Sequence, residues 1–584
     1  MQFNAMKELA FLLMFSVVLS VFVISIICKD ENVQKSIDDN QLKAFSNKWI
    51  CNSNKCEKSG YKDGISLTTC NMLCGDSPPL WPKPAQLSIM NKNSSTFLKE
   101  HIVLKIHSPE EAKPGLEELS NIFLDTLVDG EKYRLINEEG QIVKLNLHIK
   151  YHITRPLSTT NESYILYSQN INDFVAINIF ADNYFGARNG LESLMQLIWY
   201  DNIKKRYRIL HDIKITDQPK FSHRGLLLDL SRHYFPIALL KRAVDGMAAS
   251  KLNVLHLHIS DSSSFPLVLP HNADMAFEGA YDENSKYTAD DIRDLVEYAR
   301  KRGIRTVMEV DAPSHVAPHG WPKGEVLCDD PDLFKATLNP DNPHTLDTLQ
   351  SVYEDLISLG ADTETFHIGD DEVVTSCWRN TEAAKNGDLN GVWVDFSNKM
   401  IDRLRLANNG SFPKNIVLWS SPLTDNHLQS LSNQQQLVVQ YWFGKFHHIL
   451  DTGYKIIFST VGEWYLDCGF GPWRKQQQKG SCEPYTDWKK FYKYRPWKDY
   501  ATHIHQVLGG EVCLWTEQVS PDDLETRLWP RTAAFAERLW SDPEVFDQDD
   551  VYRRIDFHSR RLKARGLRVA AIWPQICSQF PERC

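Results

Sequence analysis

After Phe221 the chain alternates between short apolar runs and longer amphipathic segments. Eight runs are apolar at nearly every position, and they lie at residues 225–230, 253–259, 305–311, 365–369, 415–420, 437–442, 455–460 and 510–515. Between them, segments such as 238–251 and 289–303 repeat their apolar positions with helical spacing. Apolar strands with intervening helices are typical of a parallel sheet buried on both faces. Eight such units predict an α/β fold of the (β/α)8 barrel type.

A doubly wound open sheet is the alternative architecture for such a pattern. No Gly-x-Gly-x-x-Gly follows any of the runs, which argues against a dinucleotide site.

Residues 80–218 follow a different pattern. Runs at 102–107, 144–151 and 163–168 alternate apolar and polar positions, as half-buried strands do. Leu191, Met195 and Ile198 have helical spacing, so we expect a helix over residues 185–200. Strands and helices without strict alternation predict a small α+β domain. We therefore divide the chain into residues 1–28, 29–79, 80–218 and 219–584.

The first of these segments contains an uncharged apolar run, Leu9–Cys28, long enough to span a bilayer as a helix. No clear small-x-small cleavage site accompanies it, so a signal anchor is favoured over a cleaved signal peptide. A polar stem and a Cys-rich segment follow over residues 29–79. We expect a membrane-anchored protein of the secretory pathway, with its catalytic domain in the Golgi lumen or outside the cell, or a secreted one if the run is cleaved.

Cysteine usage fits an oxidising compartment, because ten of the 12 cysteines can form local pairs. The candidates are the cluster Cys51, Cys56, Cys70 and Cys74, then Cys328 with Cys377, Cys468 with Cys482, and Cys577 with Cys584. A zinc site stays open as an alternative for the first four. Three glycosylation sequons, at Asn93, Asn161 and Asn409, also fit lumenal exposure. The net charge of −10, without a basic stripe, argues against a nucleic-acid partner.

Polar or aromatic side chains stand at the end of every predicted barrel strand. In a barrel these ends meet on the face that carries the catalytic groups. The residues are Asp229, Arg232, Asp261, Glu309, Asp311, His315, Asp370, Asp371, Glu372, Trp419, Trp442, Trp464, Tyr465, Asp467, Trp515 and Glu517. Aromatic walls bind sugar faces, and carboxylates bind hydroxyls and move protons, so the set predicts glycoside hydrolysis by paired acids. Singly, a tryptophan is more often core, His315 a structural histidine, and Arg232 an ion-pair partner.

The motifs that surround these residues resemble those of the family 20 β-N-acetylhexosaminidases. TFHIGDDEV at 365–373 is similar to the family's H-x-G-G-D-E motif. SRHYFP at 231, HLHISDSSSFP at 256, EVDAPSH at 309, WYLD at 464, GGEVCLWTEQ at 509 and RLWPRTAAFAERLWSDP at 527 also resemble the family. The likeness covers about residues 80–584, and the Cys-rich segment and closing CSQFPERC resemble insect members.

The resemblance implies a retaining mechanism in which the substrate's own acetamido oxygen is the nucleophile, with neither metal nor organic cofactor. Glu372 would be the general acid and base, and Asp371 would hold the acetamido N–H and the developing positive charge. Asp261 and His315 resemble a relay behind Glu372. The remaining candidates would bind the terminal sugar: Arg232, Trp419, Trp442, Tyr465, Asp467, Trp515 and Glu517. We expect a raised pKa for Glu372 and an ionised Asp371.

The sequence departs from the family motifs at four positions. Asp370 replaces a glycine, Leu257 a tryptophan, Ser314 a glycine or alanine, and Thr516 a glycine. Asp tolerates a positive φ better than most residues, so Asp370 is a structural substitute or a third acid that raises the pKa of Glu372. All the expected catalytic side chains remain, which favours an active enzyme.

Three functions stay open. The first is an exo-β-N-acetylhexosaminidase that trims N-glycans and resembles the membrane-bound fused-lobes type. We expect such an enzyme to form a homodimer. The second is a hexosaminidase for chitooligosaccharides, in which Trp473 or Trp488 would wall an outer subsite. The third is a catalytically silent sugar-binding homologue, which only Asp370 and Thr516 support.

Overall fold

The computed structural model describes residues 48–59, 64–127, 140–328, 333–480, 482–580 and 583–584. The described part of the Cys-rich segment is a hairpin of β1 (Lys48–Asn52) and β2 (Lys55–Ser59), followed by α3 (Leu67–Leu73). The Ser66 side chain caps α3 by accepting from the Thr69 backbone N–H. Disulfides join Cys51 to Cys74 and Cys56 to Cys70. These residues belong to a compact unit separate from that of residues 77–200 and 206–584.

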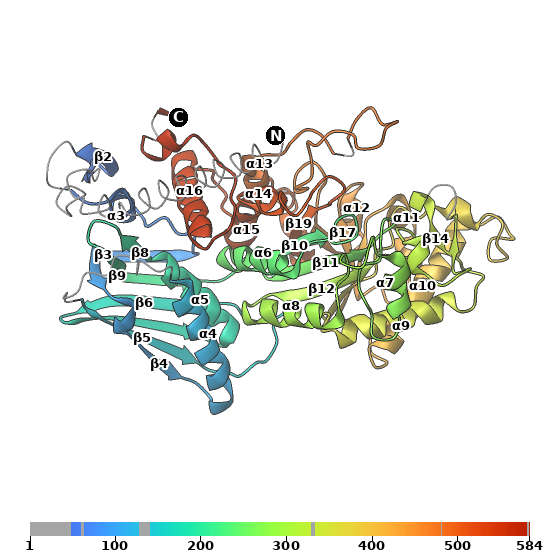
Figure 1. The fold of residues 1–584 in the computed structure, drawn as a ribbon, viewed down its shortest axis with the longest axis horizontal. Helices are drawn as coiled ribbons and strands as arrows, with labels where there is room; N and C mark the ends of the chain where they lie inside the picture. The colour runs from blue at the N-terminus through green and yellow to red at the C-terminus, as the bar shows by residue number, and fades with distance from the viewer. Residues whose placement is uncertain (1–47, 60–63, 128–139, 329–332, 481, 581–582) are drawn as a thin grey trace, which may run out of the picture. The chain divides into compact units, whose positions relative to one another are not determined.

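The small domain is a mixed sheet with two helices on one face (Figure 1). Its elements are β3 (Gln86–Phe97), β4 (Ile102–His107), α4 (Lys113–Thr126), β5 (Ile142–Ile149), β6 (Tyr164–Ile171), β7 (Phe174–Ala181), α5 (Tyr184–Gln196) and β9 (Arg206–Asp217). The strand order is β3-β9-β6-β7-β5-β4. Every second residue of β5 and β7 is buried, as the alternating sequence predicts.

The helix expected over residues 185–200 is shorter than predicted. It ends at Gln196, and Ile198–Asp201 continue as a strand. The β-branched and aromatic side chains of Ile198, Trp199 and Tyr200 favour an extended chain, which ends the helix despite the apolar spacing.

The larger domain is an eight-stranded parallel sheet, which confirms the predicted barrel class. Its strands are β10 (His223–Asp229), β11 (Val254–Ser260), β12 (Arg305–Val310), β15 (Thr365–His367), β16 (Asn415–Trp419), β17 (Leu437–Tyr441), β18 (Lys455–Phe458) and β19 (Val507–Leu514). A parallel bridge between Ala312 and Gly369 joins the chain just after the two edge strands, β12 and β15, and closes the barrel. Every described position of β10, β11, β12 and β16 is buried, because the strands are covered on both sides.

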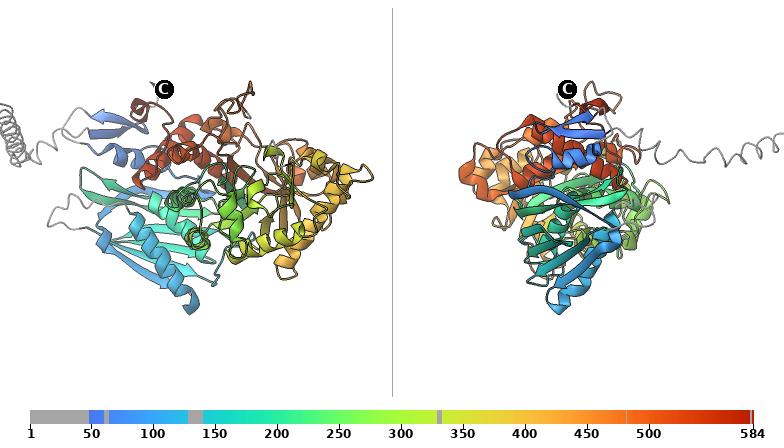
Figure 2. Two further views of the ribbon diagram at one scale, coloured as in Figure 1. Left: turned by 45° about the vertical axis from the view of Figure 1, so that its right-hand side comes forward. Right: turned by 90° about the vertical axis from the view of Figure 1, so that its left-hand side faces the viewer.

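Helices surround these strands, as two further views show (Figure 2). The longer ones are α6 (Ile237–Ala249), α8 (Ala289–Lys301), α9 (Thr345–Ser358), α10 (Leu389–Ala407), α15 (Arg531–Ser541) and α16 (Gln548–Ala564). Shorter ones are α7 (Ala273–Gly279), α11 (Pro422–His427), α12 (Phe446–Asp451), α13 (Trp488–Lys493) and α14 (Leu524–Leu528). A capping box of Thr288 and Asp291 starts α8, and its buried Ile292, Leu295 and Ala299 face the strands.

The predicted membrane segment, Leu9–Cys28, lies outside the described residues. Within the residues that are described, no helix is both long and apolar enough to cross a membrane.

Candidate active site

The catalytic candidates Asp371 and Glu372 lie on a tight turn at the C-terminal end of β15. The turn follows Gly369, which has a φ of +78°. A Cβ on Gly369 would lie 1.7 Å from Oδ1 of Asp311, so only glycine fits there. The Gly369 carbonyl accepts a hydrogen bond from the Trp419 N–H at 2.9 Å. The turn is therefore fixed from both neighbouring strands.

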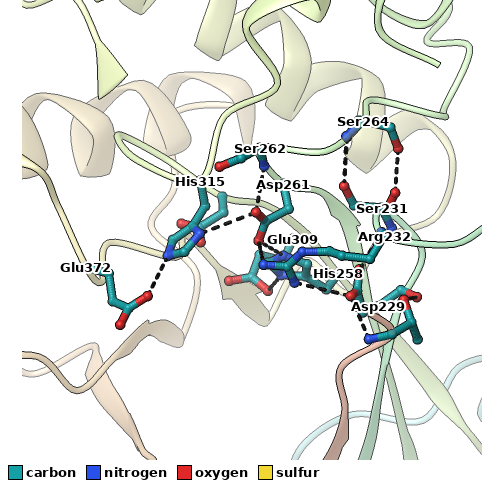
Figure 3. A network of polar contacts seen from close by, with 12 residues as sticks. Asp229, Ser231, Arg232, His258, Asp261, Ser262, Ser264, Glu309, His315 and Glu372 are labelled. Atoms are coloured by element: carbon teal, nitrogen blue, oxygen red, sulfur yellow. Dashed lines mark hydrogen bonds and ion pairs between the residues drawn. The ribbon is translucent and has the colours of Figure 1, made fainter. Parts of the chain in front are cut away.

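Glu372 ends a chain of hydrogen bonds formed by groups from three strand ends (Figure 3). His315 contacts the Glu372 carboxylate through Nε2 at 3.3 Å and the Asp261 carboxylate through Nδ1 at 3.3 Å. Although burial opposes it, the charge of Asp261 raises the pKa of His315 well above its usual range. His315 is therefore an imidazolium that bridges two carboxylates, in the arrangement expected of a relay.

The two catalytic candidates have their pKa values shifted opposite to our expectation. Burial raises the pKa of Asp371 to about 7, and the charge of Glu372 adds to the effect. The hydrogen bond from His315 lowers the pKa of Glu372, whose side chain is 57% exposed. The reason is position, because Asp371 is half-buried beside the Asp311 carboxylate, whereas Glu372 is exposed beside the His315 cation. Between these two pKa values the pair holds one proton, which rests on Asp371 when no ligand is bound.

Arg232 forms ion pairs with two barrel acids, so the plainer interpretation of this residue also holds. Its guanidinium lies 3.1 Å from Oδ2 of Asp229 and 2.6 Å from Oδ2 of Asp261. Asp467 and Glu517 line one small recess nearby. Burial and the charge of Glu517 raise the pKa of Asp467 to about 8, so one of these acids is neutral. A neutral carboxyl beside a carboxylate supplies both a donor and acceptors for sugar hydroxyls.

Four aromatic candidates share one apolar cluster with the Cys468–Cys482 disulfide: Trp419, Trp442, Tyr465 and Trp515. The ring centroids of Trp419 and Trp515 are 5.8 Å apart, and those of Tyr465 and Trp515 are 6.2 Å apart. The Trp419 indole also donates to Glu309 at 2.8 Å, which fixes its ring. The structure thus brings the predicted wall residues together.

Beneath this wall lies a buried chain of histidines and carboxylates, in which the sequence predicted roles for Asp261 and Glu309 but none for His256, His258 and Glu511. His258 bridges Asp261 at 3.0 Å and Glu309 (Figure 3). Glu309 also contacts His256 at 3.1 Å, and His256 contacts Glu511 at 3.0 Å. Although burial opposes it, the charge of Glu511 helps to raise the pKa of His256 to about 9. Alternating charges therefore extend from the barrel core to the mouth.

Within the described residues three side-chain groups bring possible metal-binding atoms within 4.8 Å of one another, and one of them is the disulfide-bonded set of Cys56, Cys70 and Cys74. The other two groups are His256, Glu309 and His367, and Asp311, His315 and Asp371. Glu309 already accepts hydrogen bonds from Trp419 and His258, which accounts for its position. The zinc alternative for the first cysteines fails, because both pairs form disulfides and leave no thiolate.

Comparison with known proteins places this strand-end site in a family. Residues 221–543, more than half of the chain, match the glycosyl hydrolase family 20 catalytic domain. The chain belongs to glycosyl hydrolase family 20. The family domain spans all eight barrel strands and every strand-end candidate named above.

Similar proteins of this family cover nearly the whole chain. The probable beta-hexosaminidase fdl of Drosophila melanogaster is 36% identical, over 92% of this chain and 90% of its own length. The chitooligosaccharidolytic beta-N-acetylglucosaminidase of Bombyx mori is 34% identical, over 92% and 95%. The solved structure of the Flavobacterium johnsoniae chitobiase has a TM-score of 0.64 at 25% identity, covering 84% of this chain and 73% of its own.

The family 20 departures lie in or beside the site. Asp370 is fully buried, and Ser314 and Thr516 are buried with hydrogen-bonded hydroxyls. The Thr516 N–H donates to Oδ2 of Asp229 at 3.0 Å and so helps to fix the carboxylate that pairs with Arg232. Leu257 is buried among apolar side chains between the two inward-facing histidines of β11.

The structure also shows the predicted disulfides, the glycosylation sequons and the two tryptophans predicted to wall an outer subsite. Disulfides join Cys328 to Cys377, Cys468 to Cys482 and Cys577 to Cys584. The sequon residues Asn93, Asn161 and Asn409 are exposed. Trp473 is 37% exposed, pairs with the Phe334 ring at 5.7 Å and lines the recess of Asp467 and Glu517. Trp488 is buried against Tyr552, so the prediction that it walls an outer subsite is wrong.

Proposed function

We propose that this chain is an exo-β-N-acetylhexosaminidase that removes terminal, non-reducing, β-linked GlcNAc or GalNAc. The observation that carries the proposal is the pairing of half-buried Asp371 with exposed Glu372, whose carboxylate contacts His315, which in turn contacts Asp261. Adjacent acids in such different surroundings suit two separate tasks in one reaction.

In this mechanism Glu372 donates its proton to the glycosidic oxygen while the acetamido oxygen attacks the anomeric carbon. The carbon–oxygen bond to the leaving group breaks, and a bicyclic oxazolinium forms with its positive charge beside Asp371. Ionised Asp371 accepts the acetamido N–H, and Tyr465 donates to the acetamido oxygen. Glu372, now a carboxylate, then takes a proton from the water that opens the ring, so the configuration is retained. Intramolecular attack removes most of the entropic cost of recruiting a nucleophile.

Substrate binding moves the single proton of the acid pair. In the empty site the proton favours Asp371, whose pKa is about 7. A ligand whose N–H bonds to Asp371, and which gains positive charge there, favours the Asp371 carboxylate and releases the proton to Glu372. Trp419, Trp442 and Trp515 would enclose the acetamido group and sugar face. Arg232, Asp467 and Glu517 would bind the terminal hydroxyls, which restricts cleavage to chain ends.

We propose N-glycans as the physiological substrates. The apolar segment Leu9–Cys28 would hold the enzyme at a Golgi or plasma membrane, facing the glycoproteins of that compartment. The five described disulfides support an oxidising compartment.

Chitooligosaccharide hydrolysis is the second candidate. The exposed ring pair of Trp473 and Phe334, beside the recess of Asp467 and Glu517, supports binding of a further sugar. The name of the Bombyx mori relative points the same way.

Product analysis on a GlcNAc-terminated biantennary N-glycan, run beside chitobiose, tests both candidates. We expect the wild-type enzyme to release GlcNAc from the N-glycan with a higher kcat/KM than from chitobiose. Glu372→Gln should release only trace GlcNAc from either substrate. A clearly higher kcat/KM on chitobiose would refute the N-glycan proposal and support the second candidate. If the wild-type chain binds GlcNAc but releases nothing, it is the silent homologue.

A further inference from the structure

The catalytic turn, residues 369–374, has a backbone that side chains normally avoid. Gly369, Asp370 and Glu372 have φ values of +78°, +73° and +44°. For a residue with a Cβ the left-handed region is sparsely populated, and it persists only where the surroundings enforce it. Something must therefore hold Asp370 and Glu372 in place.

Asp370 holds the first half of the turn. Its side chain is fully buried, and Oδ1 accepts a hydrogen bond from the Trp393 indole of α10 at 2.7 Å. Its backbone N–H donates to the Ala312 carbonyl at 3.0 Å. Burial raises the pKa of Asp370 well above its usual range, so the carboxyl is neutral and contributes a hydrogen bond without a charge.

Ser314 holds the second half. Its hydroxyl accepts a hydrogen bond from the Val374 N–H at 3.1 Å and shares another with the Thr337 hydroxyl at 2.9 Å. Ser314 is 3% exposed, so water does not replace these bonds. At both positions the family motif carries glycine, or at most alanine, neither of which offers such a bond.

We propose that Asp370 and Ser314 are positioning residues, whose side chains clamp the two halves of the catalytic turn and hold the Glu372 carboxylate against His315. The two clamps bracket Glu372, whose exposed carboxylate contacts His315 among the residues that the structure describes. With the turn fixed, the acid does not have to be reoriented during the reaction. Asp370 does not act as a third charge on Glu372, contrary to one of our expectations from the sequence.

The inference rests on the proposed function and is tested with chitobiose as substrate, because its leaving sugar must be protonated by the acid. Asp370→Gly removes the side chain but tolerates the positive φ, and Ser314→Ala removes the hydroxyl. We expect either change to lower kcat about 10- to 100-fold, with KM within a factor of about two, because the loss is in alignment of the acid. Asp370→Asn keeps the acceptor for Trp393, and we expect wild-type kcat and an unchanged pH profile.

Two tryptophan variants complete the test. Trp393→Phe removes the donor of the hydrogen bond between Trp393 and Asp370. We therefore expect Trp393→Phe to have the same kcat as Asp370→Gly, and the double variant to lose no more activity than either single variant. Trp540→Phe is the matched control, because its indole donates to Asp217 at 3.0 Å, equally buried but away from the strand ends that carry the site. We expect it to melt at a lower temperature while its kcat at 25 °C stays that of wild type.

The proposal is overturned if folded Asp370→Gly and Ser314→Ala keep wild-type kcat, or if Asp370→Asn loses as much as Asp370→Gly. If Asp370→Gly does not fold, Trp393→Phe and Ser314→Ala decide by the same criterion. An inactive wild-type enzyme would instead refute the proposed function, so the two failures are distinguishable.

Discussion

Asp371→Asn keeps the shape of the side chain and removes its charge, and we expect it to lower kcat/KM by about 10²- to 10³-fold. The pKa of Asp371 is about 7, against 3.8 for an ordinary aspartate. About three pKa units correspond to about 4 kcal/mol by which the empty site disfavours the carboxylate. In the transition state the developing positive charge stabilises the Asp371 carboxylate and so offsets this energy. An uncharged asparagine amide lacks this interaction.

The pH dependence of kcat/KM tests which residue holds the proton, because kcat/KM reports the ionisation of the free enzyme. Wild-type activity requires one proton on the pair of Asp371 and Glu372. Above pH about 7 that proton is lost, so kcat/KM should fall tenfold per pH unit. In Asp371→Asn only Glu372 titrates, and its pKa is lowered, so the alkaline limb moves to the acid side.

Initial rates from pH 3 to 9 on p-nitrophenyl-GlcNAc measure both effects, with thermal melting as the control for folding. Near-normal turnover by the variant would refute the role of Asp371. An alkaline limb that stays near pH 7 in the variant would show that another group holds the proton.

Three further outcomes are expected. Glu372→Gln should lower kcat/KM on chitobiose by about 10²- to 10⁴-fold but spare dinitrophenyl-GlcNAc in its first step, whose leaving group needs no acid; equal losses on both would contradict this. Glu309→Leu should destabilise the fold by about 3 to 5 kcal/mol in denaturant titrations, because buried His256 and His258 each lose one of their two carboxylate partners; an unchanged midpoint would argue against charged histidines. Trp473→Ala should raise KM for chitotriose about 2- to 10-fold and leave that for p-nitrophenyl-GlcNAc unchanged; equal KM values for chitotriose would remove the outer subsite.

The barrel was predictable because its strands are buried on both faces, which leaves uninterrupted apolar runs in the sequence. The strand TFHIG and its seven counterparts need no tertiary information to be recognised. The helix at 185–200 was overestimated, because helical spacing at Leu191 and Met195 says nothing about whether Ile198 starts a strand.

The site was predictable only in its membership. Strand ends converge in any barrel, so Asp371, Glu372 and His315 could be grouped from the sequence. Their pKa order could not be predicted, because it depends on which adjacent carboxylate points inward and which meets His315. The buried chain through His258 and Glu309 left one signal, the alternation in HLHI, which places two histidines on the same inward face.

Competition between a GlcNAc-thiazoline, a stable mimic of the cyclised sugar, and plain GlcNAc tests the central claim most directly. If Asp371 and Glu372 are built around an acetamido group that attacks its own anomeric carbon, the thiazoline should inhibit at least about 10²-fold more tightly than GlcNAc. Equal inhibition constants would mean that the barrel mouth recognises the sugar but not its cyclised form, and the mechanism would be wrong.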